Sequence, residues 1–139
     1  MYQRALQGYE KALSPEHTST LPTVNNLGLL YTSRGKLVEA EQMYQRALQG
    51  YEKAVGEDNV TTYPPALNTI ENPGSLFESQ GDIAKARTMY SNAFIGNEIP
   101  FGPDHPRSRS LRDKVSALDV VIKNKASKRH KLFRKLGLR

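Results

Sequence analysis

Residues 43–54 read MYQRALQGYEKA, and residues 1–12 carry the same twelve residues in the same order. An identity of this length is beyond chance, so the chain repeats itself with a period of 42 residues. A weaker third copy follows 46 residues later, its four extra residues falling within 55–68. In that copy Gly35 recurs as Gly81, Tyr44 as Tyr90 and Ala47 as Ala93. A period between about 20 and 50 residues is typical of proteins built from stacked repeats.

Each unit contains two stretches in which apolar or small residues recur every three or four positions. The first stretch carries Leu21, Val24, Leu27, Gly28 and Tyr31, and the second carries Leu37, Ala40, Tyr44, Ala47, Leu48, Tyr51 and Ala54. This spacing places the side chains on one face of a helix. Gly35 lies between the stretches and tolerates the positive φ that ends a helix. The sequence therefore predicts an all-α fold, in which two antiparallel helices meet at a tight turn over residues 34–36.

The charge of the chain is unevenly distributed. The formal net charge is +6, yet residues 123–139 hold eight Lys or Arg and no acidic residue, which leaves residues 1–122 with a net charge of −2. The chain is thus a near-neutral body followed by a basic tail. It has no Cys, which excludes disulfides, thiolate metal sites and a cysteine nucleophile. No apolar run approaches the length of a membrane-spanning helix.

The spacing Leu27-Gly28-x-x-Tyr31-x-x-x-Gly35-x-Leu37-x-x-Ala40-x-x-x-Tyr44-x-x-Ala47-Leu48 resembles the tetratricopeptide (TPR) repeat. The 42-residue period, together with Asn25-Asn26-Leu27 and the loop Pro15-Glu16-His17, is similar to the kinesin-light-chain type of this repeat. The resemblance implies a short α-solenoid of antiparallel helix pairs. It is specific for the fold and unspecific for the activity, because repeats of this kind serve many partners.

The resemblance divides the chain into three parts. We expect TPR-like repeats over 1–98, as units 1–42 and 43–88 with a partial unit from 89, then a degenerate capping helix over 99–122 and a basic tail over 123–139. Solenoids need such atypical ends to cover an apolar face. Because residue 1 aligns with the second helix of a unit, we expect the chain to be a piece of a longer repeat protein.

The second unit departs from the first at Pro73, which aligns with Leu27. A proline inside a helix removes a hydrogen bond and clashes with the preceding turn. We therefore expect a kink at Pro73, or a helix that begins only near it, followed by a second helix over about 83–95. The apolar rhythm of residues 106–125 predicts another helix, with Asp104 as its expected N-cap.

Residues that could perform chemistry are sparse. His17, His105 and His130 lie in two predicted loops and the tail, without metal-ligand spacing. There is no Gly-rich phosphate loop and no nucleophile elbow. We expect no enzyme activity, no catalytic or metal-binding residue, no cofactor and no small-molecule substrate. The tyrosines mostly fall on the packing stripes, so we interpret them as core residues.

The resemblance implies that the first helix of each unit lines a concave groove. The groove residues would be Pro22, Asn25, Leu29, Thr32 and Ser33 in the first unit, and Asn68, Glu71, Ser75, Glu78 and Ser79 in the second. Asn25 is able to hydrogen-bond a peptide backbone as donor and acceptor, although a polar residue on a solvated face explains it equally well. TPR units that clamp a C-terminal carboxylate carry Asn directly after the helix glycine. Here those positions are Leu29 and Ser75, which argues against that ligand.

Two functions follow as hypotheses. The first is non-catalytic binding of a protein or peptide partner in the groove, as an adaptor or as a segment of a larger scaffold. The alternative is weak binding to a polyanion, either nucleic acid or anionic lipid, through the tail. The tail candidates are Lys123, Lys125, Lys128, Arg129, Lys131, Arg134 and Lys135. We expect a cytoplasmic location, with nuclear import through the basic tail as an alternative.

Overall fold

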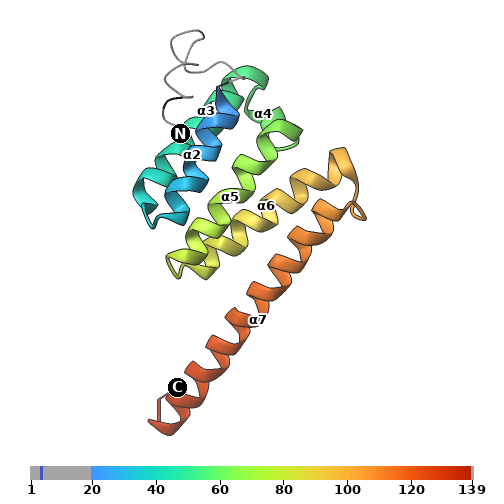
Figure 1. Cartoon of the computed structure of the whole chain (residues 1–139). Coiled ribbons are helices and arrows are strands. Elements are labelled where there is room, and N and C mark those ends of the chain that lie inside the picture. The colour runs from blue at the N-terminus through green and yellow to red at the C-terminus, as the bar shows by residue number, and fades with distance from the viewer. Residues whose placement is uncertain (1–3, 5–19, 139) are drawn as a thin grey trace.

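The computed structural model describes Arg4 and residues 20–138, and Figure 1 traces their path. Over the described residues the chain forms helices and no strand. The helices are α2 (Leu21–Ser33), α3 (Leu37–Val55), α4 (Glu57–Val60), α5 (Pro64–Ser79), α6 (Ile83–Phe101) and α7 (Pro106–Lys135). The all-α class predicted from the sequence is confirmed. Apart from Arg4, the helix expected over residues 1–12 lies outside the described residues.

The helices form antiparallel pairs joined by the predicted turns. Gly35 separates α2 from α3 with a φ of 73°, and Gly81 separates α5 from α6 with a φ of 78°. Only glycine adopts such angles without strain. The pair α5–α6 packs against the first pair mainly through α3, and α7 packs against α6. Figure 1 shows the resulting stack.

A glycine and a tyrosine hold each pair together. An added Cβ on Gly28 would lie 2.6 Å from Cε1 of Tyr44, and one on Gly74 would lie 2.4 Å from Cε1 of Tyr90. Both tyrosines are buried, at 2% and 3% exposure. The absent side chain lets the first helix approach the ring of the second. The tyrosines are therefore core residues, as the sequence predicted.

Helix α5 continues through Pro73. It begins at Pro64, where proline is tolerated because the first helical N–H has no intrahelical acceptor. The expectation of a helix that begins only near Pro73 is therefore wrong. Pro73 still lacks an N–H, so the carbonyl of Thr69 loses its usual intrahelical donor. The short helix α4 fills part of the insertion between the first and second pairs.

The expected N-cap of the C-terminal helix α7, Asp104, is wrong. The N-cap is His105, whose Nδ1 accepts a hydrogen bond from the backbone N–H of Arg107 at 3.2 Å, and not Asp104. The ring of His105 also stacks on Phe101, the last residue of α6, with centroids 4.7 Å apart. An imidazole acceptor thus replaces the carboxylate that the sequence suggested. Helix α6 itself runs six residues beyond the expected end at 95.

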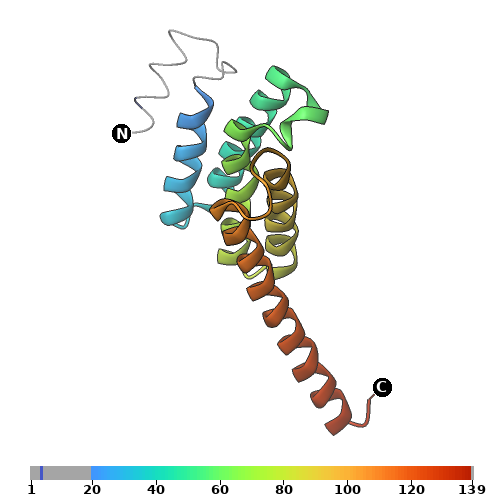
Figure 2. The same cartoon turned by 90° about the vertical axis from the view of Figure 1, so that its right-hand side faces the viewer.

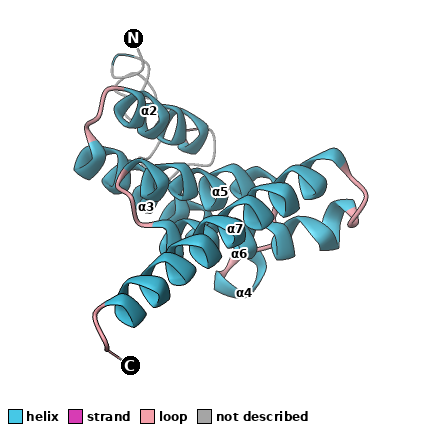
Figure 3. Cartoon of the chain, turned by 90° about the horizontal axis from the view of Figure 1, so that it is seen from below, coloured by secondary structure: helices cyan, strands magenta, loops and turns pink. Residues whose placement is uncertain are grey.

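Helix α7 is far longer than its packing requires. Ser108, Leu111 and Leu118 are buried against the body, and every described residue from 119 to 138 is exposed. An ion pair between Arg87 of α6 and Asp119 marks the point where α7 leaves the body. Figures 2 and 3 show the second half of α7 projecting away from the other helices. One helix therefore runs across the expected boundary at 122/123. That boundary separates segments of different charge and does not separate two structural elements.

Candidate protein-binding face

Helices α2 and α5 border a small hollow on the face where the groove was predicted. It has a volume of about 200 Å³, and the predicted groove residues Pro22, Asn25 and Asn68 line it. The other lining residues are Asn26, Tyr51, Pro65 and Thr69. Three amides and two hydroxyls share this hollow with two prolines, so it offers hydrogen bonds beside apolar surface, as the main chain of a peptide requires.

The side chain of Asn25 forms hydrogen bonds within the protein at this hollow. Its side chain is 7% exposed, and its Oδ1 accepts hydrogen bonds from Asn72 Nδ2 at 3.0 Å and from Thr69 Oγ1 at 3.4 Å. Asn25 therefore ties α2 to α5 across the two units. Its carbonyl oxygen is already occupied, so only its amide N–H₂ remains to meet a ligand.

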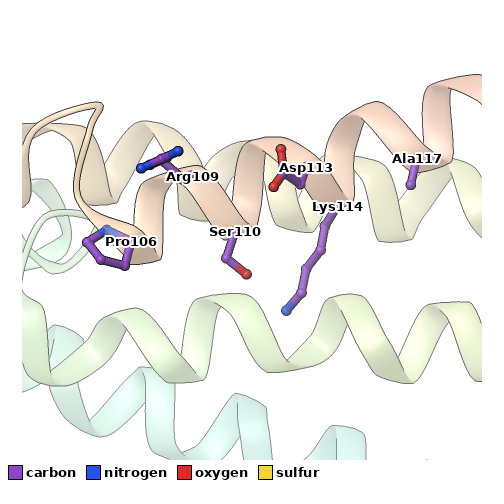
Figure 4. Close-up of a pocket in the computed structure, with 6 residues that line it drawn as sticks. All are labelled: Pro106, Arg109, Ser110, Asp113, Lys114 and Ala117. Carbon is purple, nitrogen blue, oxygen red and sulfur yellow. The ribbon is translucent and has the colours of Figure 1, made fainter.

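Helix α7 reaches across to the predicted groove residues of α5. Lys114 Nζ donates to Glu71 Oε1 at 2.7 Å, and Arg107 Nη2 lies 3.8 Å from Glu71 Oε2. Arg107 also donates to Asn68 Oδ1. Figure 4 shows Lys114 and Ser110 pointing from α7 toward the neighbouring α5 ribbon. The carboxylate of Glu71 is therefore neutralised by two cations, and α7 supplies a third wall to the face.

A shallow surface runs along this part of α7. It has a volume of about 610 Å³, and Figure 4 labels its lining residues, which are Pro106, Arg109, Ser110, Asp113, Lys114 and Ala117. Helix α7 packs after α6 in the stack, in the position that the first helix of a third pair would take. Its surface therefore extends the face formed by the first helices α2 and α5. The extended face has charges of both signs and small side chains.

Glu78, another groove candidate on α5, lies beside the phenol of Tyr90. Burial, and next the negative charge of Glu78, raise the pKa of Tyr90 well above its usual value of 10.0. Thr32 plays the equivalent part in the first pair, with its Oγ1 3.3 Å from the hydroxyl of Tyr44. These two groove candidates therefore support the core tyrosines.

The hydroxyls of the remaining candidates bond to their own helices. Thr32 Oγ1 donates to the carbonyl of Gly28 at 2.9 Å, and Ser33 Oγ donates to that of Leu30 at 2.8 Å. Ser75 Oγ donates to the carbonyl of Asn72 at 2.9 Å. Each hydroxyl still has lone pairs to offer a ligand. Leu29 is 41% exposed and is the one large apolar residue among the groove candidates.

The tail candidates all lie on the projecting half of α7. These residues, Lys123, Lys125, Lys128, Arg129, Lys131, Arg134 and Lys135, are exposed. None of them forms an ion pair within residues 20–138. Because a helix fixes their spacing, they form a rigid basic rod.

The described residues hold no cluster of three or more His, Asp or Glu side chains able to bind a metal ion. Among the described helices, none combines the length and the apolar character needed to cross a bilayer. The face between α2, α5 and α7 and the rod of α7 are therefore the two features that the predicted functions can use.

Sequence reasoning missed Lys114 and Arg107 as parts of the face. The C-terminal helix lacks the Leu-Gly-x-x-Tyr signature, so its register against the earlier units could not be assigned. The Pro103-Asp104-His105-Pro106 loop was the available signal. It fixes where the helix begins, and therefore which residues lie in the first turns next to α5.

Comparison with known proteins agrees with the fold. The model of the tetratricopeptide repeat family matches residues 1–53, which include the turn at Gly35 and most of α3. No curated protein matches the chain. The match and the paired helices support a TPR-type repeat protein. They do not separate the kinesin-light-chain type from other types, so that assignment stays a prediction.

Proposed function

We propose that this chain is a non-catalytic module that binds a protein or peptide segment on the face formed by α2, α5 and the first half of α7. The observation that carries the proposal is the arrangement of the first helices of successive pairs side by side. Apart from Leu29, their outward groove positions are polar or small, while the second helices α3 and α6 supply the core tyrosines. Repeats of this type generally act as scaffolds for protein partners.

The face favours an extended, largely neutral ligand. Pairing with Lys114 and Arg107 cancels the charge of Glu71, and Asn68 and the amide of Asn25 offer hydrogen bonds to a main chain. The described face is short, since only three helices contribute to it. We therefore expect low affinity for a single short peptide, because few contacts offset the ordering of the ligand.

Selection from a displayed peptide library tests this proposal. Peptides selected on the full chain should lose affinity for the variant Ser110→Arg, which puts a long charged side chain into the shallow surface of α7 that faces α5. Gln49→Arg is the matched control, because Gln49 is exposed on α3 and lines neither hollow of the face. Peptides that bind both variants equally well would place the binding site elsewhere.

The alternative function is binding of a polyanion along the projecting half of α7. Seven exposed cations in a stretch that holds no acidic residue favour it, because clustered Lys and Arg attract phosphates. Deletion of 123–139 should abolish salt-sensitive retention on duplex DNA or on phosphatidylserine vesicles, and should leave peptide binding intact. Retention that survives the deletion would contradict this role. The cytoplasmic location, with nuclear import through the same residues as the alternative, stays a prediction.

A further inference from the structure

A second groove runs between α3 and α6 and shares one lining residue, Thr69, with the hollow of the peptide-binding face. Two adjoining hollows of about 470 and 190 Å³ share four lining residues, Leu48, Thr69, Pro73 and Met89. Helix α5 forms the floor through Thr69, Pro73 and Phe77, and these residues lie on the opposite side of α5 from Glu71 and Ser75. We call this feature the α3–α6 groove.

Pro73 is the reason why this groove is open. Its equivalent in the first pair is Leu27, which is 3% exposed and fills the core between α2 and α3. The smaller ring of Pro73 is only partly buried and leaves space between α3 and α6. It also leaves the carbonyl of Thr69 without its helical donor.

The α3–α6 groove is apolar with acidic ends. Ile95 and Ile99 on α6 contribute to its wall and are 57% and 74% exposed. Among the described residues, Glu41 and Glu52 of α3 are the only charged ones that line it. Neither carboxylate forms an ion pair with any of residues 20–138. An apolar helix that carries positive charges is the chemistry that such a groove complements.

The exposed half of α7 has this chemistry. The stripe that packs on α6 through Leu111 and Leu118 continues at helical spacing into Ile122, is interrupted by Lys125 and Arg129, and resumes at Leu132 and Leu136. Phe133 lies beside this stripe and is 39% exposed, so one face of the helix carries apolar side chains and cations together. Two such helices would repel each other through their like charges, which argues against pairing of α7 with α7.

We propose that the projecting half of α7 docks in the α3–α6 groove of a second copy of the chain. Helix α7 is continuous from Pro106 to Lys135 and leads away from its own body, so it reaches its own groove only if the helix breaks. Contact between unlike surfaces is a heterologous interface, which yields either reciprocal dimers or longer assemblies.

The dimensions of the two surfaces agree. Glu41 and Glu52 are eleven residues apart on α3, or about 16 Å along its axis at 1.5 Å per residue. Lys125 and Lys135 are ten residues apart on α7, or about 15 Å. A docked helix can therefore place one cation near each acidic end while Leu132 lies over Pro73 and Met89.

Sedimentation velocity of the full chain, over a wide range of concentration, tests the proposal. The average mass should rise with concentration at low salt and fall when salt is added. The groove variant Glu41→Lys/Glu52→Lys and the tail variant Lys125→Glu/Lys135→Glu should each remain monomeric. An equimolar mixture of the two should associate again, because each groove then meets a tail of opposite charge. Glu39→Lys, on the same helix but outside the groove, should associate like the parent chain.

Pro73→Leu gives a second test that misfolding cannot mimic. The leucine restores the helical N–H and fills the groove, so this variant should be more stable than the parent chain and yet fail to associate. A parent chain that stays monomeric at all concentrations would overturn the proposal. So would a mixture that does not restore association, or association only in the presence of DNA or anionic vesicles. None of these outcomes bears on peptide binding at the opposite face of α5.

Discussion

Gly74 and Tyr90 are in contact across the second helix pair, and a Cβ on Gly74 would approach the Tyr90 ring to 2.4 Å. The same contact joins Gly28 to Tyr44 in the first pair, at 2.6 Å. Both intervals in sequence are sixteen residues. The repeat in the sequence therefore corresponds to a repeated contact between a glycine on the first helix and a tyrosine on the second helix of each pair.

Gly74→Ala should lower the stability of the fold. Overpacking in a core costs about 1–3 kcal/mol, and the better helix propensity of alanine offsets about 1 kcal/mol of this. We expect a net loss of up to about 2 kcal/mol in the free energy of unfolding, measured with urea. In the Gly74→Ala/Tyr90→Ala double variant, the loss should be smaller than the sum of the two single losses. Simple additivity would show that the ring is not the obstacle.

Asn25→Ala should destabilise the contact between the two helix pairs. It removes the acceptor of Asn72 Nδ2 and Thr69 Oγ1, and unmet buried hydrogen bonds cost about 1–3 kcal/mol. Thermal unfolding followed by circular dichroism should detect the change. Asn26→Ala is the control and should lie within about 0.5 kcal/mol of the parent chain, as is usual for sites away from such networks. Equal effects at the two positions would exclude the bridging role.

Alkaline pH should unfold the chain partly through Tyr90. Its pKa is raised in the folded state, so the unfolded state loses this proton first as the pH rises through 10. The stability that depends on the neutral phenol is present below pH 10 and is lost above it. Tyr90→Phe should therefore flatten the decline in urea midpoint above pH 10. An unchanged slope in this variant would assign the decline to other groups.

Removal of residues 123–139 should leave the stability of the body unchanged. All described residues from 119 onward are exposed, so the deletion takes no side chain from the core. Differential scanning calorimetry at low concentration should give the same midpoint for both chains. Leu118→Ala provides the contrast, because this residue is 7% exposed and its truncation should cost about 2–4 kcal/mol. A large fall in the midpoint of the shortened chain would mean that the projecting half contacts the body.

The sequence was sufficient for the helix pairs and their turns. The identical copies at 1–12 and 43–54, and the glycines at 35 and 81, determine helix spacing and turn geometry by local rules. The core residues could be predicted by the same local rules. Ala40, Tyr44 and Tyr90 are buried, and they lie on the apolar stripes that the helical spacing of three and four residues predicts.

The site was harder to predict because it depends on contacts between units. Asn25 looked solvent-facing from its own helix, and only the arrival of Thr69 and Asn72 from α5 buries it. The partners of Glu71 come from Lys114 and Arg107, about forty residues later in a helix without the family signature. The α3–α6 groove could not be predicted from the sequence either, because it is the space that Pro73 leaves between two helices that are distant in sequence.

The anchoring of α7 at one end has a mechanical consequence. Asp119 forms the last ion pair with the body, through Arg87, whereas Lys135 lies sixteen residues farther on, or about 24 Å along an unsupported helix. A tilt of about ten degrees at Asp119 moves the far end by about 4 Å. A small rotation at the Arg87–Asp119 contact therefore becomes a larger displacement of the basic tip.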